Sequence, residues 1–224
     1  MTAHICEHLL MKKLRNLIAV VVALAGVGQT IAASNVDLSV KGTITPSACT
    51  PLLSNGGIVD HGKVSAQDLT GSLNPLPPVT LELSVTCAAS TLFAIKSTDN
   101  RQGTSADSEE GGSGLSTFGI GLTHDGKKIG WYTLKLSGAL ADGVARPVIE
   151  SVDGHTWMNA DTSIWQPSWL RSVYDAAVGV PSPMPVQTLV SNLVIETTLR
   201  NVRALAIDQD TPIDGSATLD IVYL

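Results

Sequence analysis

The residues that could do chemistry are scattered along this sequence, and none of them forms a known catalytic pattern. Beyond residue 33 there are three histidines, His61, His124 and His155, which match neither an H-E-x-x-H motif nor a cysteine–histidine metal cluster. Serines are frequent, yet the chain has no G-x-S-x-G elbow of a serine hydrolase and no glycine-rich phosphate loop. We therefore expect no catalytic residues, no metal site, no cofactor and no enzymatic activity.

An acidic loop near the end of the chain is the first candidate for ligand binding. Asp208, Asp210 and Asp214 gather in DQDTPIDG (208–215). Calcium prefers such oxygen ligands, but the spacing of an EF-hand and its closing glutamate are missing. A solvated turn before the last strand is the favoured interpretation.

A tryptophan-rich stretch is the second candidate. Trp157, Trp165 and Trp169 fall within thirteen residues, in a part of the chain with few clear strand signals. Exposed on loops, such rings could stack on sugar faces, as in a carbohydrate- or surface-binding adhesin module. Aromatic residues make up only 4% of the chain, and large rings dominate core energetics. The favoured interpretation is therefore that the tryptophans close one end of the core.

The first 33 residues have the pattern of a secretory signal peptide. A basic start after Met11 is followed by an apolar run over 17–27 and by small residues before Ser34. Residues 1–10 precede the basic start, so translation could begin at Met11. The apolar run is too short for a comfortable membrane span. We therefore expect an exported mature chain, residues 34–224, with no integral membrane segment.

The mature chain keeps two cysteines, Cys49 and Cys87, because Cys6 is lost with the leader. An even number of cysteines in an oxidising compartment usually forms disulfides, so we expect a Cys49–Cys87 bridge rather than two free thiols. The bridge would close a loop of about 38 residues and stabilise the fold by roughly 3–4 kcal/mol.

The charge of the chain limits its partners. Its 14 basic and 20 acidic residues give a net charge of −6, and no basic stripe remains in the mature part. A basic footprint is what nucleic acids and anionic lipid surfaces attract. We therefore expect neither of them as a partner.

Turn pairs and alternating apolar residues predict an all-β protein. Pairs such as Asp125-Gly126 and Asp214-Gly215 separate short runs that alternate or are rich in β-branched residues. Residues 99–114 form a polar loop, and 168–179 is the best candidate for a short helix. Many short strands and one disulfide indicate a single β-sandwich domain over 34–224. We expect strands over 35–45, 57–64, 79–87, 91–98, 118–124, 128–137, 186–200 and 217–224.

Both ends of the mature chain read as strands that need a sheet neighbour. At the C-terminus one face of the last expected strand carries four apolar or aromatic residues. At the N-terminus the first expected strand begins just after Ser34 and has three apolar residues at alternate positions. Strand addition between chains exploits such ends, since the backbone supplies hydrogen bonds and alternate side chains set the register. The residues are Ala217, Leu219, Ile221 and Tyr223 at the C-terminus, and Val36, Leu38 and Val40 at the N-terminus.

Three motifs at these positions resemble those of chaperone–usher pilin subunits. KGTITPSAC (41–49) fits the first-strand pattern G-x-[VI]-x-x-x-x-C, and VTLELSVTC ends at the second cysteine as theirs does. ATLDIVYL (217–224) fits their last strand, with tyrosine next to last. The order and spacing of the motifs, together with the signal peptide, make the resemblance specific. It is closer still to a fimbrial-like group of secreted proteins of unknown function.

The resemblance implies an immunoglobulin-like, pilin-type β-sandwich that lacks its final strand and so has a hydrophobic groove. A periplasmic pilus chaperone would lend a strand along Ala217, Leu219, Ile221 and Tyr223, and another fimbrial subunit or the usher would follow. Cys49–Cys87 would join the first two strands, and Val36, Leu38 and Val40 would belong to the donor strand.

The implied function is that of a fimbrial or fimbrial-like subunit in pilus assembly or adhesion, in the periplasm or on a cell-surface fimbrium. The segment before Gly42 departs from the pilin pattern. Only eight residues, Ser34 to Lys41, precede this glycine after the expected cleavage. Such an extension is short for a donor strand. A subunit that does not polymerise and the tryptophan-based binding module therefore stay open as alternatives.

Overall fold

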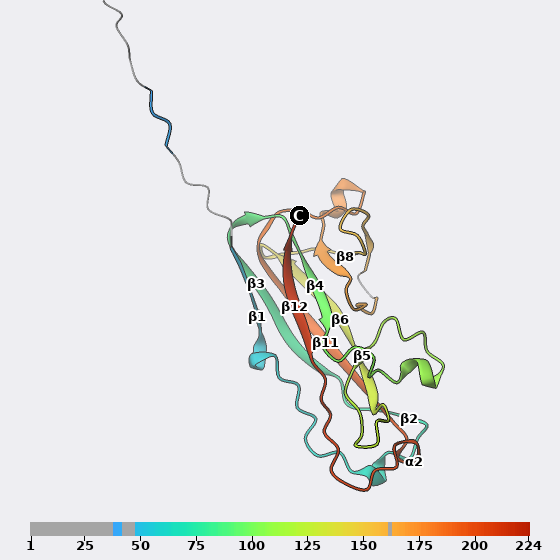
Figure 1. The fold of residues 1–224 in the computed structure, drawn as a ribbon. Coiled ribbons are helices and arrows are strands. Elements are labelled where there is room, and N and C mark those ends of the chain that lie inside the picture. The colour runs from blue at the N-terminus through green and yellow to red at the C-terminus, as the bar shows by residue number, and fades with distance from the viewer. Residues whose placement is uncertain (1–37, 42–47, 161–162) are drawn as a thin grey trace, which may run out of the picture. The chain divides into compact units, whose positions relative to one another are not determined.

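The computed structural model describes residues 38–41, 48–160 and 163–224 (Figure 1). The chain divides into two units, residues 1–44 and 45–224. In the first unit residues 38–41 form no regular element, and the side chains of Leu38 and Val40 are 88% and 89% exposed. Val36, Gly42 and Ile44 lie outside the described residues.

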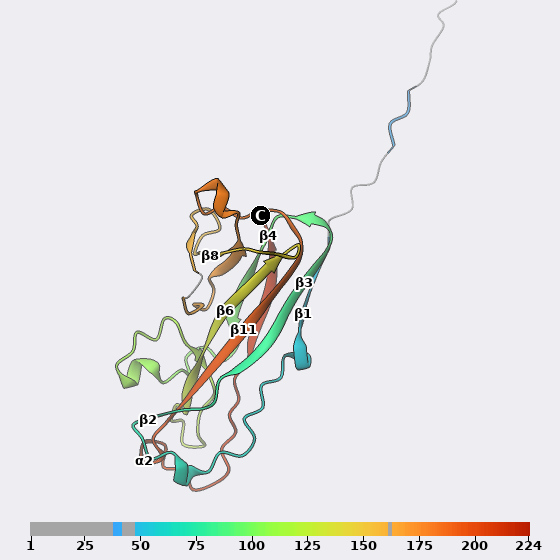
Figure 2. The same ribbon diagram turned by 180° about the vertical axis from the view of Figure 1, so that it is seen from behind.

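The second unit contains two antiparallel sheets, which confirms the expected all-β sandwich. In the first sheet five strands follow in the order β1-β3-β11-β6-β5, while β2 pairs with β11 and β7 with β6. Figure 2 shows β3, β11 and β6 side by side. The bounds are β1 (Cys49–Leu53), β2 (Leu73–Pro75), β3 (Val79–Thr91), β5 (Phe118–Gly119), β6 (Gly130–Ala141), β7 (Val144–Ala145) and β11 (Val186–Arg200).

The second sheet has five strands in the order β12-β4-β10-β8-β9. Its last strand in sequence, β12, therefore lies at one edge and pairs with β4 alone. The bounds are β4 (Phe93–Asp99), β8 (Val148–Ser151), β9 (Met158–Asn159), β10 (Leu170–Val173) and β12 (Ala217–Tyr223).

Helical structure among the described residues is confined to single turns. They are η1 (Ser54–Gly57), η2 (Ala66–Asp68), η3 (Asp107–Glu110), η4 (Ala176–Val178) and α2 (Val202–Leu205). None of these helices is long and apolar enough to cross a bilayer. Several sequence-based expectations were wrong. Residues 168–179 hold β10 and η4 rather than a helix, and residues 38–41 and 58–64 form no strand. Of the strand expected over 118–124 only Phe118–Gly119 forms one.

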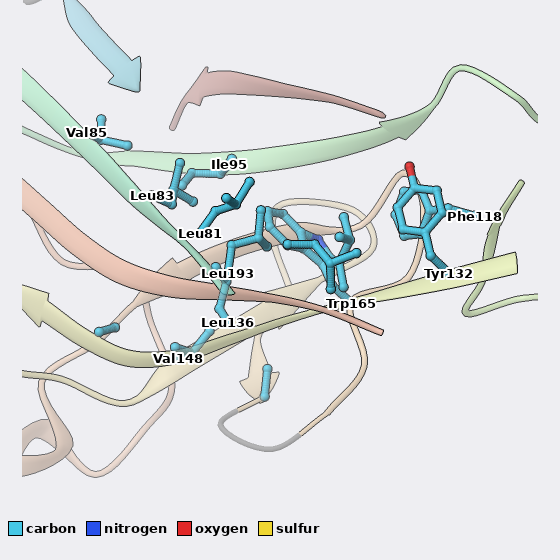
Figure 3. Close-up of a cluster of buried hydrophobic side chains, with 14 of the residues drawn as sticks. Leu81, Leu83, Val85, Ile95, Phe118, Tyr132, Leu136, Val148, Trp165 and Leu193 are labelled. Atoms are coloured by element: carbon cyan, nitrogen blue, oxygen red, sulfur yellow. The ribbon is translucent and has the colours of Figure 1, made fainter. Parts of the chain in front are cut away.

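The core lies between the sheets and follows the alternation of the long strands. In β3 the residues at Leu81, Leu83 and Val85 are buried while their neighbours face outward. Because successive side chains of a strand point to opposite faces, this period of two buries one face of each strand. Figure 3 shows these side chains with Ile95 of β4 and Leu193 of β11.

The expected disulfide is confirmed. Cys49 of β1 and Cys87 of β3 are bonded and stand directly opposite each other in the antiparallel ladder. The bridge ties the edge strand β1 to its neighbour β3. It therefore fixes the strand that forms one wall of the groove described below.

Candidate strand-binding groove

The outer edge of β12 carries unpaired backbone groups. Two backbone hydrogen bonds just outside the strand show which residues of β12 bond to β4. Asn100 N–H donates to the carbonyl of Ser216 (3.0 Å), and Leu224 N–H donates to the carbonyl of Leu92 (3.1 Å). Hydrogen-bonded positions alternate in an antiparallel pair, so the backbone groups of every second residue point away from β4. These residues are Ala217, Leu219, Ile221 and Tyr223. Within the described part of the chain their N–H and C=O groups have no partner.

The facing edge, that of β1, offers fewer groups. Ala88 N–H donates to Ala48 O at 3.1 Å, so Cys49, Pro51 and Leu53 turn their backbone away from β3. Proline has no N–H, and prolines at strand edges oppose further pairing. The N–H of Cys49 already donates to the Tyr223 hydroxyl at 2.9 Å. An added strand would therefore pair mainly with β12.

An apolar cavity of about 260 Å³ lies between these two edges. Its walls come from Leu53 of β1 and from Ala217 and Leu219 of β12, and core side chains such as Leu81 and Ile195 also line it. The cavity therefore opens the core of the sandwich where the two sheets lack a connecting strand. Figure 1 shows β12 beside β4 with its other edge free.

A second cavity of about 710 Å³ adjoins the first. Both are lined by Val59, His61 and Ile213, so together they form one groove. The lower part runs between residues 59–66 and 207–213, and no backbone hydrogen bond joins these two segments, both of which are fully described. At the other end the Tyr223–Cys49 hydrogen bond bridges the two edges. We call the whole feature the β1–β12 groove.

Polar side chains are few in the first cavity. His61 Nε2 lies 3.0 Å from the hydroxyl of Thr197 on β11, which is 4% exposed. Tyr132 also lines the first cavity. Burial raises the pKa of its phenol, and the charge of Asp99 adds to the effect, so the phenol stays neutral. The first cavity is thus lined mainly by apolar side chains, whereas Asp60, Lys63 and Asp210 give the second cavity charged walls.

The structure places the sequence-predicted residues of β12 as follows. Leu219 and Ile221 are partly buried and pack against the core, and Ala217 lines the groove. Tyr223 is 52% exposed, and its hydroxyl accepts the hydrogen bond from Cys49. All four therefore lie on the groove side of the strand.

The three tryptophans do not share one environment. Trp165 is fully buried, its Nε1 donates to the carbonyl of Trp169 at 3.0 Å, and the Arg171 guanidinium lies 5.6 Å from its ring. Trp169 is partly buried against the core. Trp157 is partly buried as well, and its Nε1 donates to Gly154 O at 3.2 Å. A fully buried ring cannot stack on a sugar, so Trp165 is a core residue.

A buried ion pair supports the region around these tryptophans. Arg171 Nη2 bonds Glu150 Oε2 at 2.9 Å, and both side chains are at most 8% exposed. Ser163 accepts two further bonds from the same nitrogen, through its carbonyl and its hydroxyl. The pair joins β8 to β10, and sequence reasoning missed it because neither residue stands in a recognisable motif.

His61 and Thr197 were also missed as groove residues. The histidine reads as a surface or turn residue, since it lies in a short segment rich in turn formers. Thr197 could have been found from the sequence, because it alternates with Ile195 and Leu199 on the face of β11 that points to the core. Polar residues at an inward position of a long strand are unusual unless they are hydrogen-bonded.

Comparisons with known proteins agree with the expected resemblance to a group of unknown function. A family model described as a protein of unknown function (DUF1120) matches residues 38–133. Protein GltF of Escherichia coli (strain K12) is 28% identical over 227 residues, covering 85% of this chain and 89% of GltF. The uncharacterized protein YhcF of the same organism is 26% identical over 224 residues, covering 86% and 92%. The similarity to these two relatives thus extends over most of the chain.

One solved structure is similar in outline. A chain from a structure titled as that of a chaperone–usher pilus, on the molecular basis of rod uncoiling, aligns with 88% of this chain and all of its own length. The two are 12% identical and the TM-score is 0.33. The fold assignment therefore rests on the strand pairing of this chain.

Proposed function

We propose that this protein is an exported fimbrial or fimbrial-like structural subunit that assembles by β-strand complementation. The partner strand comes from a periplasmic pilus chaperone or from a neighbouring subunit. The observation that carries the proposal is the unpaired edge of β12 beside a groove whose first cavity is lined mainly by apolar side chains and reaches the core. Residues 1–33 act as the export signal in this account, and residues 34–41 are the candidate donor strand.

The geometry of the groove gives strand addition its physical basis. An incoming strand would pair with the free backbone groups of Ala217, Leu219 and Ile221, while its alternate side chains would fill the space beside Leu53 and Leu81. Backbone pairing supplies affinity in this mode and the pockets supply register. An unprotected strand edge is otherwise an aggregation hazard, so a covered groove is the favoured working state.

The alternative of a sugar-binding surface has less support. It relied on Trp157, Trp165 and Trp169 as a group, and Trp165 lies in the core. Among the described residues, the one side-chain hydrogen-bond partner of His61 is the hydroxyl of Thr197, which is neither an acid nor an activated nucleophile. A structural role is therefore proposed rather than an enzymatic one.

The test compares two substitutions on opposite faces of β12. Leu219→Glu places a carboxylate in the groove, whereas Val222→Glu places one on the outer face, which does not line it. Tagged mature chains are isolated from periplasm, and bound proteins are identified by mass spectrometry. A chain truncated after Gly215 serves as the negative control.

We expect an immunoglobulin-like chaperone or a fimbrial subunit with the wild-type and Val222→Glu chains only. A wild-type chain that is a stable, partner-free monomer in periplasm would contradict the proposal. Circular dichroism of both variants separates loss of binding from loss of folding.

A further inference from the structure

Among the described residues that line the β1–β12 groove, His61 and Thr197 are the only two whose side chains are hydrogen-bonded to each other. Thr197 lies on the inward face of β11 between Ile195 and Leu199, which are 6% and 2% exposed. His61 lies opposite, on the segment that follows β1, with its Nε2 at 3.0 Å from the threonine hydroxyl. The first cavity is lined mainly by apolar side chains, and the pair places hydrogen-bonding groups at a defined position in it.

The position of this pair along β12 can be read from the packing. Thr197 stands opposite Tyr132 in the ladder of β11 and β6. The Tyr132 ring lies against Gly215, where an added Cβ would be 3.0 Å from Cε1. Gly215 precedes β12 by two residues, so the pair lies near the beginning of β12 and far from Tyr223. Here the two cavities meet, and both include His61.

The pair keeps unused hydrogen-bonding capacity. A hydroxyl has one donor and two acceptor sites, and a neutral imidazole has one donor and one acceptor. Whichever of the two groups donates in the 3.0 Å contact, the threonine oxygen still has a free site and His61 Nδ1 has no partner in the described chain. An apolar side chain placed here would exclude water and leave these sites unmet, which costs about tenfold or more in affinity.

Resting on the proposed function, we infer that the β1–β12 groove selects a strand with one polar residue in its apolar face. The occupant is an extended polypeptide, because the free N–H and C=O groups of β12 match a strand and not a compact small molecule. The residues that it places in the first cavity are apolar except for the one that faces His61 and Thr197. That residue is serine, threonine or asparagine, whose side chains can both donate and accept.

The test is a double-mutant cycle with two synthetic peptides. Both are eleven residues long by design, about the length of a long strand. They have valine at inward positions and lysine or threonine between. In the second peptide the central inward valine is replaced by serine. Binding to the mature, disulfide-bonded protein is measured by fluorescence anisotropy, and amide protection at Leu219 and Ile221 confirms the location.

Thr197→Val removes the hydroxyl while keeping the shape of the side chain, and Thr198→Val is the matched control on the outer face of the same strand. We expect wild type and Thr198→Val to bind the serine peptide at least as tightly as the valine peptide. Thr197→Val should shift the ratio of the two affinities towards the valine peptide by about tenfold, the value of one buried polar group fewer to be satisfied.

The outcomes separate the two proposals. A valine-to-serine affinity ratio that is the same within twofold in wild type and in Thr197→Val overturns the inference and leaves strand complementation standing. If neither peptide binds to any variant with protection of Leu219 and Ile221, strand complementation fails, and the inference fails with it. Thermal melts of both variants show whether each chain is folded.

Discussion

Removing the disulfide should lower the free energy of unfolding by about 4 kcal/mol. The perturbation is the double substitution Cys49→Ala/Cys87→Ala. The bridge spans a sequence separation of 38 residues, and the loop-entropy relation for a loop of this size gives about 4 kcal/mol at 25 °C. For a domain of this length each kcal/mol shifts the melting temperature by about 2–4 °C. The variant should therefore melt about 8–16 °C below wild type.

Urea denaturation followed by tryptophan fluorescence measures this loss directly. Trp165 is fully buried, so its emission shifts to longer wavelength when the core opens. Wild type reduced with dithiothreitol is the matched control and should lose the same amount, since it keeps both side chains. A loss below about 1 kcal/mol in both samples would refute the reasoning, because it would mean that the bridge does not restrict the unfolded chain.

Three further predictions concern the core and the surface. Glu150→Ala should cost about 3–5 kcal/mol in urea denaturation, because it leaves the buried charge of Arg171 unpaired; adding Arg171→Met should restore part of the loss. Trp165→Ala should cost about 3–5 kcal/mol in urea denaturation followed by circular dichroism, through the cavity that it leaves. Hydrogen bonds to the carboxylate, first of all from the N–H of Thr156, lower the pKa of Asp153 to about 2. Its stabilising contribution is thus present above its usual pKa and is lost as the pH falls towards 2, and an NMR titration of the carboxyl carbon should show a midpoint clearly below the usual value.

The long strands could be predicted from sequence because apolar residues recur at most of their alternate positions. β11 spans the expected residues 186–200, and β12 begins at the expected Ala217. The free edge at the C-terminus followed from the same pattern. In β11 and β12 one face of the strand is mostly apolar, so the sequence predicts which face is buried.

The strands of the second sheet around the tryptophans could not be predicted. All four residues of β10 and all four of β8 are buried, and they include Arg171 and Glu150, which are tolerated inside because they pair with each other across the strands. A strand that is buried on both faces shows no alternation. The His61–Thr197 pair was missed for a related reason, since it joins residues 136 positions apart.

Hydrogen exchange of β12 is the most direct test of the proposed groove. In the isolated mature protein, the amides of Thr218, Asp220 and Val222 should exchange slowly because they pair with β4, while those of Leu219 and Ile221 should exchange fast. With a strand bound, all five should become slow. Slow exchange of Leu219 and Ile221 in the isolated protein, or fast exchange of both in the complex, would contradict an open edge that a partner strand completes.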